Sequence, residues 1–228
     1  MSIAVIIAAA GSGVRLGGDI PKQFQLLGDK PILAHTMDAF NRADIVRDII
    51  VAVPEEHVTY SQEIVARFGC TKVRATVPGS TSRAASVYSA LKLLPADTEI
   101  VLIHDGVRPF VSGRLIKAVA ESSMTHGAAI AGTVMTDTLK EADENGQITA
   151  TPDRRRFWRA QTPQGFTYEL IMKAYAQGEK DGILSHATDD SALVERLGVP
   201  VYMVEGDAGN IKITTQEDLA LGEVLLRM

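Results

Sequence analysis

Short apolar runs alternate with amphipathic segments of helix length along most of this chain. Runs such as VIIAAA and IVLIH carry no polar alternation, which is typical of strands buried on both faces of a parallel sheet. The alternation predicts a doubly wound α/β fold with a mostly parallel, Rossmann-like sheet. We expect strands at Ile3–Ala8, Asp48–Val53, Lys72–Val77, Glu99–Ile103, Ala128–Val134 and Val199–Val204. We expect helices at Pro31–Arg42, Glu55–Phe68, Ser82–Leu94, Ser112–Thr125, Tyr168–Glu179, Asp189–Leu197 and Thr215–Arg227.

Polar or glycine-rich turns follow three of these strands. They span Gly11–Lys22 after the first strand, Pro78–Arg83 after the third and His104–Pro109 after the fourth. Ligands of doubly wound sheets sit in the crevice beyond the carboxyl ends of the strands. We therefore expect the three turns to converge on one ligand site.

One stretch, Thr136–Ala150, breaks the strand–helix rhythm. It alternates weakly and contains Asn145-Gly146, a strong hairpin signal. It predicts a protruding β-arm over about residues 136–155, from which Thr151–Thr162 returns the chain to the body. An isolated hairpin needs a partner surface, so we expect a homodimer. No repeat or linker divides the chain, and residues 1–228 are expected to form a single domain that carries this arm.

Composition excludes several classes of protein. The net charge of −5 argues against a nucleic-acid binder that relies on a broad basic surface. A single cysteine, Cys70, excludes an intramolecular disulfide and a cysteine-rich metal site. No apolar stretch approaches the roughly 20 residues that span a bilayer. The N-terminus lacks the basic segment of a signal peptide, so we expect a cytoplasmic protein without a membrane partner.

The glycine loop after the first strand, AAAGSGVRLGGDIPKQ, fits neither standard nucleotide motif. Leu16 occupies the third glycine position of the dinucleotide fingerprint, and Asp19 and Ile20 stand where a P-loop requires Lys and Ser/Thr. Two interpretations remain. The loop wraps a triphosphate with its backbone N–H groups and adds Arg15 and Lys22, or it is a structural turn with solvated charges.

Several motifs occur together and in a fixed order: AAAGSGVRLGGDIPKQF, PGSTSRAASV, HDGVRPF, TDTLKE, TPDRRRFWRAQTPQGF, TDDSALVERLG and GNIKITTQEDLALGE. From about Ile3 to the C-terminus the chain resembles the 2-C-methyl-D-erythritol 4-phosphate cytidylyltransferases of the non-mevalonate isoprenoid pathway. The resemblance implies a nucleotidyltransferase that joins CTP and methylerythritol phosphate with release of pyrophosphate, using Mg²⁺.

The resemblance also assigns roles to individual residues. Arg15 and Lys22 match the catalytic cations, and Asp105 matches the acidic residue near Mg²⁺ and the sugar alcohol. The nucleotide would be bound by Ala9, Ala10, Gly11, Gly79, Arg83 and Ser86. The second substrate would be bound by Asp105, Arg108, Thr138, Arg154 and Lys212, with Thr138 and Arg154 reaching across a dimer interface.

This chemistry is consistent with the residues present. A phosphomonoester is largely dianionic at neutral pH, so the attacking oxygen needs no general base. The transfer needs positive charge around the phosphates and in-line positioning instead. The sequence accordingly has no G-x-S-x-G elbow, and no histidine shows metal-ligand spacing; we expect His104 to orient the loop that carries Asp105.

Other interpretations remain open for several features. Asp105 could serve only as a turn cap and Arg108 only as its partner, and Arg155 and Arg156 are expected to be solvated. Pro78-Gly79 replaces a glycine pair common in the family, and HDGVRP stands where HDAARP is common. The competing functions are a ribitol-5-phosphate cytidylyltransferase, a nucleotide sensor without turnover and an NAD-dependent dehydrogenase.

Overall fold

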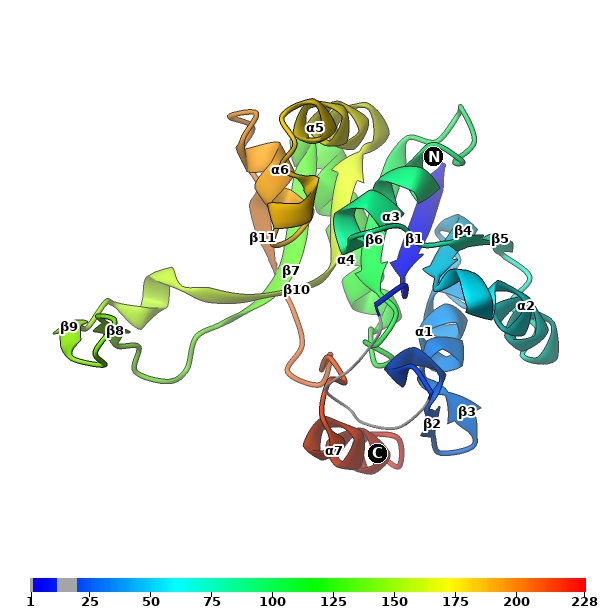
Figure 1. Ribbon diagram of the computed structural model, residues 1–228, viewed down its shortest axis with the longest axis horizontal. Helices are drawn as coiled ribbons and strands as arrows, with labels where there is room; N and C mark the ends of the chain where they lie inside the picture. The colour runs from blue at the N-terminus through cyan, green and yellow to red at the C-terminus, as the bar shows by residue number, and fades with distance from the viewer. Residues whose placement is uncertain (1, 12–19) are drawn as a thin grey trace.

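The computed structural model describes residues 2–11 and 20–228, and its centre is a seven-stranded sheet (Figure 1). The strand order is β11-β7-β10-β6-β1-β4-β5. All neighbouring pairs are parallel except the two that β10 makes with β6 and β7. The strands are β1 (Ile3–Ala8), β4 (Val46–Val53), β5 (Val73–Pro78), β6 (Ile100–Asp105), β7 (Ala128–Val134), β10 (Trp158–Thr167) and β11 (Tyr202–Glu205). The predicted α/β class with a mostly parallel sheet is confirmed.

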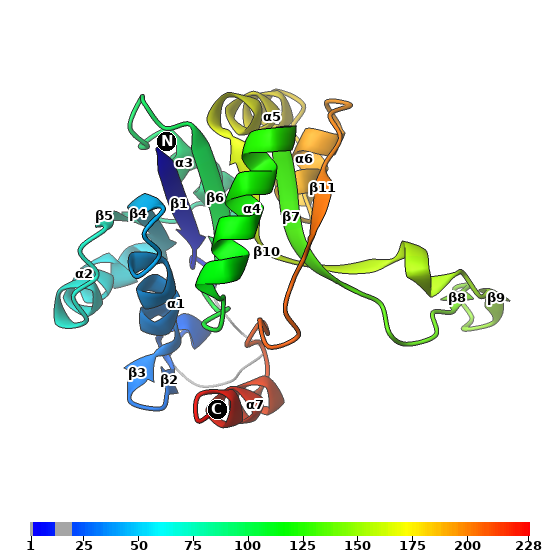
Figure 2. The same ribbon diagram turned by 180° about the vertical axis from the view of Figure 1, so that it is seen from behind.

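Helices cover both faces of the sheet (Figures 1 and 2). One face packs against α1 (Ile32–Asn41), α2 (Val58–Arg67) and α4 (Gly113–His126). The opposite face packs against α3 (Arg83–Leu91), α5 (Tyr168–Lys180) and α6 (Ser191–Glu195). Short 3₁₀ turns occur at η2 (Lys22–Phe24), η3 (Glu55–His57), η4 (Arg154–Arg156) and η5 (Leu184–His186).

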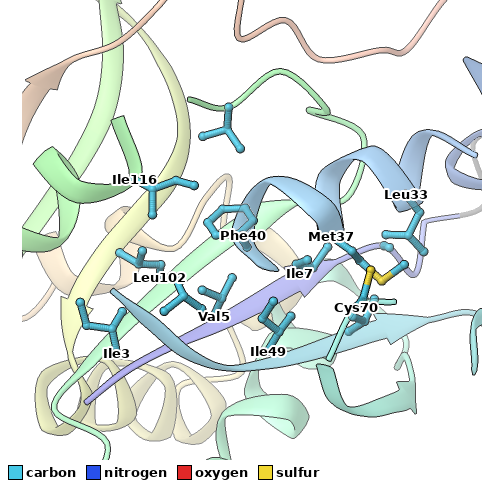
Figure 3. Packing of buried hydrophobic residues seen from close by; sticks show 14 of the residues in the cluster. Ile3, Val5, Ile7, Leu33, Met37, Phe40, Ile49, Cys70, Leu102 and Ile116 are labelled. Atoms are coloured by element: carbon cyan, nitrogen blue, oxygen red, sulfur yellow. The ribbon is translucent and has the colours of Figure 1, made fainter. Parts of the chain in front are cut away.

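Strand β1 explains why the apolar runs lack polar alternation. Ile3, Val5 and Ile7 point into the cluster formed with α1 and α4 (Figure 3), whereas Ala4 and Ile6 belong to the cluster on the opposite face. All five side chains are fully buried. A strand covered by helices on both sides gains burial free energy from every residue, so each position is apolar.

A third, smaller apolar cluster closes the carboxyl-terminal edge of the sheet. It joins Leu27, Ile32, Val107 and Ile213. Leu27 belongs to the short hairpin of β2 (Leu26–Leu27) and β3 (Lys30–Pro31), and Ile213 precedes α7 (Gln216–Leu225). Helix α7 begins with a capping box of Thr215 and Asp218. The last helix and the β2–β3 hairpin thereby frame the edge where ligands are expected.

The long strand β10 is the main feature that sequence analysis missed. The expectation was a return segment over Thr151–Thr162, but Trp158–Thr167 forms a ten-residue strand in the middle of the sheet. The run contains Gln161, Pro163 and Gln164, and therefore lacks the continuous apolar pattern by which the other central strands were found. Two other bounds were too wide, since β11 begins at Tyr202 and α6 covers only Ser191–Glu195.

The β-arm extends away from the body between β7 and β10 (Figures 1 and 2). It consists of β8 (Glu141–Ala142) and β9 (Ile148–Ala150), paired antiparallel. The Asp143 carboxylate accepts the backbone N–H groups of Asn145 and Gln147 at 2.9 Å each, and Gly146 takes a φ of +81°. The Asn-Gly pair thus forms the turn because glycine adopts positive φ without strain. The predicted protruding arm is confirmed.

In the described part of the chain, no helix has the length and apolar character needed to cross a bilayer.

Candidate active site

A cavity of about 440 Å³ opens at the carboxyl-terminal edge of the sheet. The turns after β1, β5 and β6 all contribute to its wall, so the expected convergence of three turns on one crevice is observed. Eight of the predicted site residues line this cavity: Ala9, Ala10, Gly11, Lys22, Arg83, Ser86, Asp105 and Lys212. Arg15, the other predicted cation of the glycine loop, lies outside the described residues.

Backbone segments approach one another closely on the β1–β5 side of the cavity. A Cβ atom added to Gly79 would lie 2.2 Å from the Cβ of Ala10 and 3.3 Å from the carbonyl oxygen of Val53. Only glycine therefore fits at position 79 without displacing the turn after β1. Beside it, the Ser86 hydroxyl accepts the Ser80 N–H and donates to the Ser82 carbonyl, both at 2.8 Å. These contacts fix the shape of the turn that leads into α3.

Gln23 anchors the beginning of the glycine loop, although sequence reasoning assigned it no role. Its buried side-chain amide donates to the Ala9 carbonyl at 2.6 Å and to the Gly11 carbonyl at 3.2 Å. Both acceptors belong to the turn after β1. Gln23 follows Lys22 directly, so this anchor also holds the cation beside the turn. Gln23 belongs to the PKQF segment of the family motif, but its contacts with the turn after β1 are visible only in the folded structure.

Asp105, at the end of β6, is the centre of a cluster of three cations. Its carboxylate lies 2.9 Å from Lys212 Nζ, 3.2 Å from Arg83 Nε and 3.5 Å from Arg108 Nε. Burial alone would raise the pKa of this carboxyl, but the charges of Arg83, Lys212 and Arg108 outweigh burial and hold the pKa well below its usual range. Asp105 therefore stays ionised. Its carboxylate brings together three cations that are far apart in the sequence.

A second cavity of about 340 Å³ adjoins the first. Arg83, Asp105 and Lys212 line both cavities, and Arg108 lines only the second. Arg108 Nη1 donates to the Asn210 carbonyl at 2.8 Å, while its buried Nε has no hydrogen-bond partner among the described residues. The three shared side chains mark the boundary at which ligands in the two cavities would meet.

His104 supports the backbone of Asp105 through a chain of hydrogen bonds. The Asp105 N–H donates to Thr162 Oγ1 at 3.1 Å, and Thr162 Oγ1 lies 3.0 Å from His104 Nδ1. His104 Nε2 lies 3.1 Å from the Arg108 carbonyl, which can only accept, so Nε2 carries the proton and Nδ1 accepts from Thr162. Burial lowers the pKa of His104 to about 4, which keeps the ring neutral. This arrangement agrees with the expectation that His104 orients the loop.

Arg83 faces a second carboxylate, Asp190, which sequence reasoning did not single out. Its Nη1 and Nη2 donate to Asp190 at 3.0 and 2.8 Å. Burial alone lowers the pKa of Arg83, but the charges of Asp190 and Asp105 outweigh it and raise the pKa above its usual value. The TDD motif contains Asp190, yet nothing in the sequence pairs it with a residue more than 100 positions away.

Thr138 and Arg154 lie apart from this site. Both are exposed on the arm, and Arg154 Nη1 donates to the Thr136 carbonyl at 2.6 Å. The described residues that line the two cavities include none from the 136–155 segment. The structure therefore unites the predicted nucleotide residues with Asp105, Arg108 and Lys212, but does not bring the two arm residues to them within one chain.

The described residues offer limited protein ligands for a metal ion. They contain no cluster of three or more His, Cys, Asp or Glu side chains arranged to hold one. Asp105 is the one carboxylate among the described residues that line the larger cavity. Mg²⁺ is commonly held by one or two carboxylates together with substrate phosphates and water. The site therefore suits a metal carried largely by a polyphosphate, with Asp105 as a protein ligand.

Comparison with known proteins gives one consistent result. The family model for 2-C-methyl-D-erythritol 4-phosphate cytidylyltransferase matches residues 3–228. The protein of that name from Geotalea uraniireducens is 45% identical over 230 residues, covering 100% of this chain and 97% of its own. The one from Desulforamulus reducens is 42% identical over 227 residues, covering 99% and 96%. The crystal structure of 4-diphosphocytidyl-2C-methyl-D-erythritol synthase from Anaerococcus prevotii aligns with a TM-score of 0.86 at 33% identity, covering 100% and 96%. Because the family model matches residues 3–228 and a solved member shares the fold, the chain belongs to the 2-C-methyl-D-erythritol 4-phosphate cytidylyltransferase family.

Proposed function

We propose that this chain transfers the cytidylyl group of CTP to 2-C-methyl-D-erythritol 4-phosphate. A phosphate oxygen of the alcohol phosphate attacks the α-phosphorus, the bond to the β-phosphate breaks, and pyrophosphate leaves. The product is 4-diphosphocytidyl-2-C-methyl-D-erythritol, an isoprenoid precursor. The observation that carries this proposal is the pair of adjoining cavities joined by Arg83, Asp105 and Lys212 in a chain that matches the family over nearly its whole length.

The larger cavity is the proposed CTP site. Ala9, Ala10 and Gly11 line one wall, where a nucleoside can be held by main-chain contacts. Gly79 packs against Ala10 behind this wall, and Ser86 fixes the adjoining turn. Arg83 orients the nucleotide where the cavity meets its neighbour. Arg15 and Lys22 are the proposed catalytic cations, which neutralise charge on the α-phosphate and the departing pyrophosphate.

The smaller cavity is the proposed site of the alcohol phosphate. Lys212 and Arg108 line this cavity and supply positive charge beside Asp105. Thr138 and Arg154 would complete this site from a second copy of the chain, because the arm that carries them points away from its own body. The proposal thus includes a homodimer formed through the arm.

Mg²⁺ is the proposed metal, held by Asp105 and the triphosphate. When bound it would supply Lewis-acid charge neutralisation at the phosphates. Lys212, at 2.9 Å from Asp105, is placed to orient the same carboxylate and to contact an incoming phosphate. CTP and phosphorylated sugar alcohols are cytoplasmic metabolites, so the proposed location is the cytoplasm.

Measuring pyrophosphate release tests the function directly. Purified protein with CTP and Mg²⁺ is supplied with either methylerythritol 4-phosphate or ribitol 5-phosphate, and the products are identified by mass. We expect turnover with methylerythritol phosphate, and loss of turnover on chelation with EDTA. Preference for ribitol 5-phosphate would replace the proposed substrate, and CTP binding without product would indicate a nucleotide sensor.

A further inference from the structure

The structure assigns Asp190 as a positioning residue that holds the Arg83 guanidinium at the boundary of the two cavities. This inference rests on the proposed function and deepens it, because it names the group that keeps a cation in place where the two substrates meet. Asp190 lines neither cavity and is fully buried. Its effect on the reaction is exerted through Arg83.

Two carboxylates bind the Arg83 guanidinium along different edges. Asp190 takes the outer edge through Nη1 and Nη2, in a two-pronged contact of 3.0 and 2.8 Å. Asp105 takes Nε at 3.2 Å. A planar guanidinium held at both edges cannot turn about its side chain, so its free N–H bonds keep one direction. Arg83 is therefore prevented from swinging toward the triphosphate or from taking Asp105 away from Lys212.

Asp190 is itself held by groups that leave it no other position. The Tyr175 hydroxyl donates to its Oδ1, and its backbone N–H donates to Gln164 Oε1 at 3.1 Å. Gln164 Oε1 also accepts the Ser191 N–H at 3.0 Å, and its amide donates to Asp189 at 2.8 Å. Strand β10, helix α5 and the start of α6 thus converge on one carboxylate whose role is to fix Arg83.

A purely structural ion pair elsewhere in the chain provides a matched control. Asp48 has a side chain that is 3% exposed and lies beside two arginines, Arg47 and Arg74. It lies on β4 and does not line either of the two cavities. D190N removes a buried carboxylate charge from Arg83, and D48N removes one from Arg47 and Arg74, while both keep the shape of the side chain. Only D190N releases a cation that faces the substrates.

The test measures kcat, both KM values and CTP affinity for wild type, D190N and D48N. We expect D190N to lower kcat at least about tenfold while CTP affinity changes less than about threefold, since the backbone wall of the CTP site is untouched. D48N should keep kcat within about threefold of wild type, although both variants lower the thermal unfolding midpoint. If D190N lowers kcat no more than D48N does, the inference is overturned.

A double-mutant cycle adds a readout that general destabilisation does not produce. If Asp190 acts through Arg83, the variant R83Q/D190N should have the same kcat as R83Q alone, because the cation to be positioned is already absent. If the loss of kcat in R83Q/D190N equals the product of the losses in the two single variants, the inference is overturned. A wild-type protein that releases no pyrophosphate would refute the proposed function together with this inference.

A second variant covers the case in which D190N does not fold. R83K keeps the positive charge but lacks the planar fork that Asp190 grips. We expect kcat to fall at least about tenfold, and by a larger factor than CTP affinity falls. A kcat close to that of wild type would show that the two-pronged contact is dispensable, and would overturn the inference.

Discussion

At the scale of single residues, the site depends on buried polar groups that each have a defined partner. His104 is the clearest case. Its ring is fully buried, donates to the Arg108 carbonyl and accepts from Thr162, and its pKa is lowered to about 4. A buried polar group is favourable only when its hydrogen bonds are made, and a proton added to Nδ1 would break the bond from Thr162.

This leads to a prediction for the pH dependence of stability. The folded pKa of His104 is about 4 and the unfolded value about 6.5, so the unfolded chain takes up a proton that the folded chain refuses. The free energy of unfolding should therefore fall as the pH decreases through that window, by roughly 3 kcal/mol in all. Urea unfolding at about pH 7 and pH 5 should show a much smaller decrease in the free energy of unfolding for H104Q than for wild type. The exposed control H186Q should show the same decrease as wild type. A decrease in H104Q equal to that of wild type would contradict the assignment.

A second residue-scale prediction concerns Gly79. The variant G79A introduces a methyl group 2.2 Å from the Cβ of Ala10, so the turn after β1 must move. We expect the Kd for CTP to rise about tenfold, equivalent to 1.4 kcal/mol, when measured by calorimetry. The matched control is G113A, since nothing lies within 4 Å of a Cβ at that position. CTP affinity equal to that of the control would show that this close approach does not shape the nucleotide site.

At the scale of secondary-structure elements, β10 supplies four of the residues that line the smaller cavity. It is antiparallel to both neighbours, and three of its side chains face polar partners near the cavities. Thr162 supports Asp105, Gln161 donates to the Asp207 carbonyl at 2.8 Å, and Gln164 holds the start of α6. The polar residues that hid this strand from sequence analysis are the ones that organise the site.

The variant Q164L tests this contribution. It leaves the buried N–H groups of Asp190 and Ser191 without their acceptor, and each such loss costs about 1–3 kcal/mol. We expect the free energy of unfolding to fall by roughly 2 kcal/mol or more, with a parallel loss of kcat. Q177L is the control, because the Gln177 side chain is exposed on α5 and donates to Asp181. Equal unfolding midpoints for the two variants in urea would show that Gln164 does not anchor α6.

At the scale of the whole molecule, the residues of the proposed site are divided between the body and the arm. The cavities lie in the body, whereas Thr138 and Arg154 are exposed on the arm that extends from it (Figure 2). R154A should weaken the use of methylerythritol phosphate and leave CTP affinity nearly unchanged, because Arg154 does not line the proposed CTP cavity. An equal fall in CTP binding would contradict this placement.

Mixing two variants that are each impaired at a different residue tests the shared site. If Arg154 acts in the neighbouring subunit, a heterodimer of K22A and R154A contains one intact site and one doubly defective site. Random exchange of subunits should then restore roughly a quarter of wild-type activity, since half of the dimers are mixed and each has one working site. The measurement is pyrophosphate release before and after subunit exchange. Activity that stays at the level of the separate variants would place both residues in one chain.

The α/β class, most of the parallel strands and the arm follow from the amino-acid sequence. The reason is that burial on both faces leaves a continuous apolar pattern, and Asn145-Gly146 specifies its turn locally. The sequence also indicated the turns that line the cavity, because the carboxyl ends of parallel strands share one edge. The place of β10, the neutral tautomer of His104 and the contact of Asp190 with Arg83 became visible only in the folded structure. Those features depend on hydrogen bonds and ion pairs between residues far apart in the chain, and no local pattern encodes them.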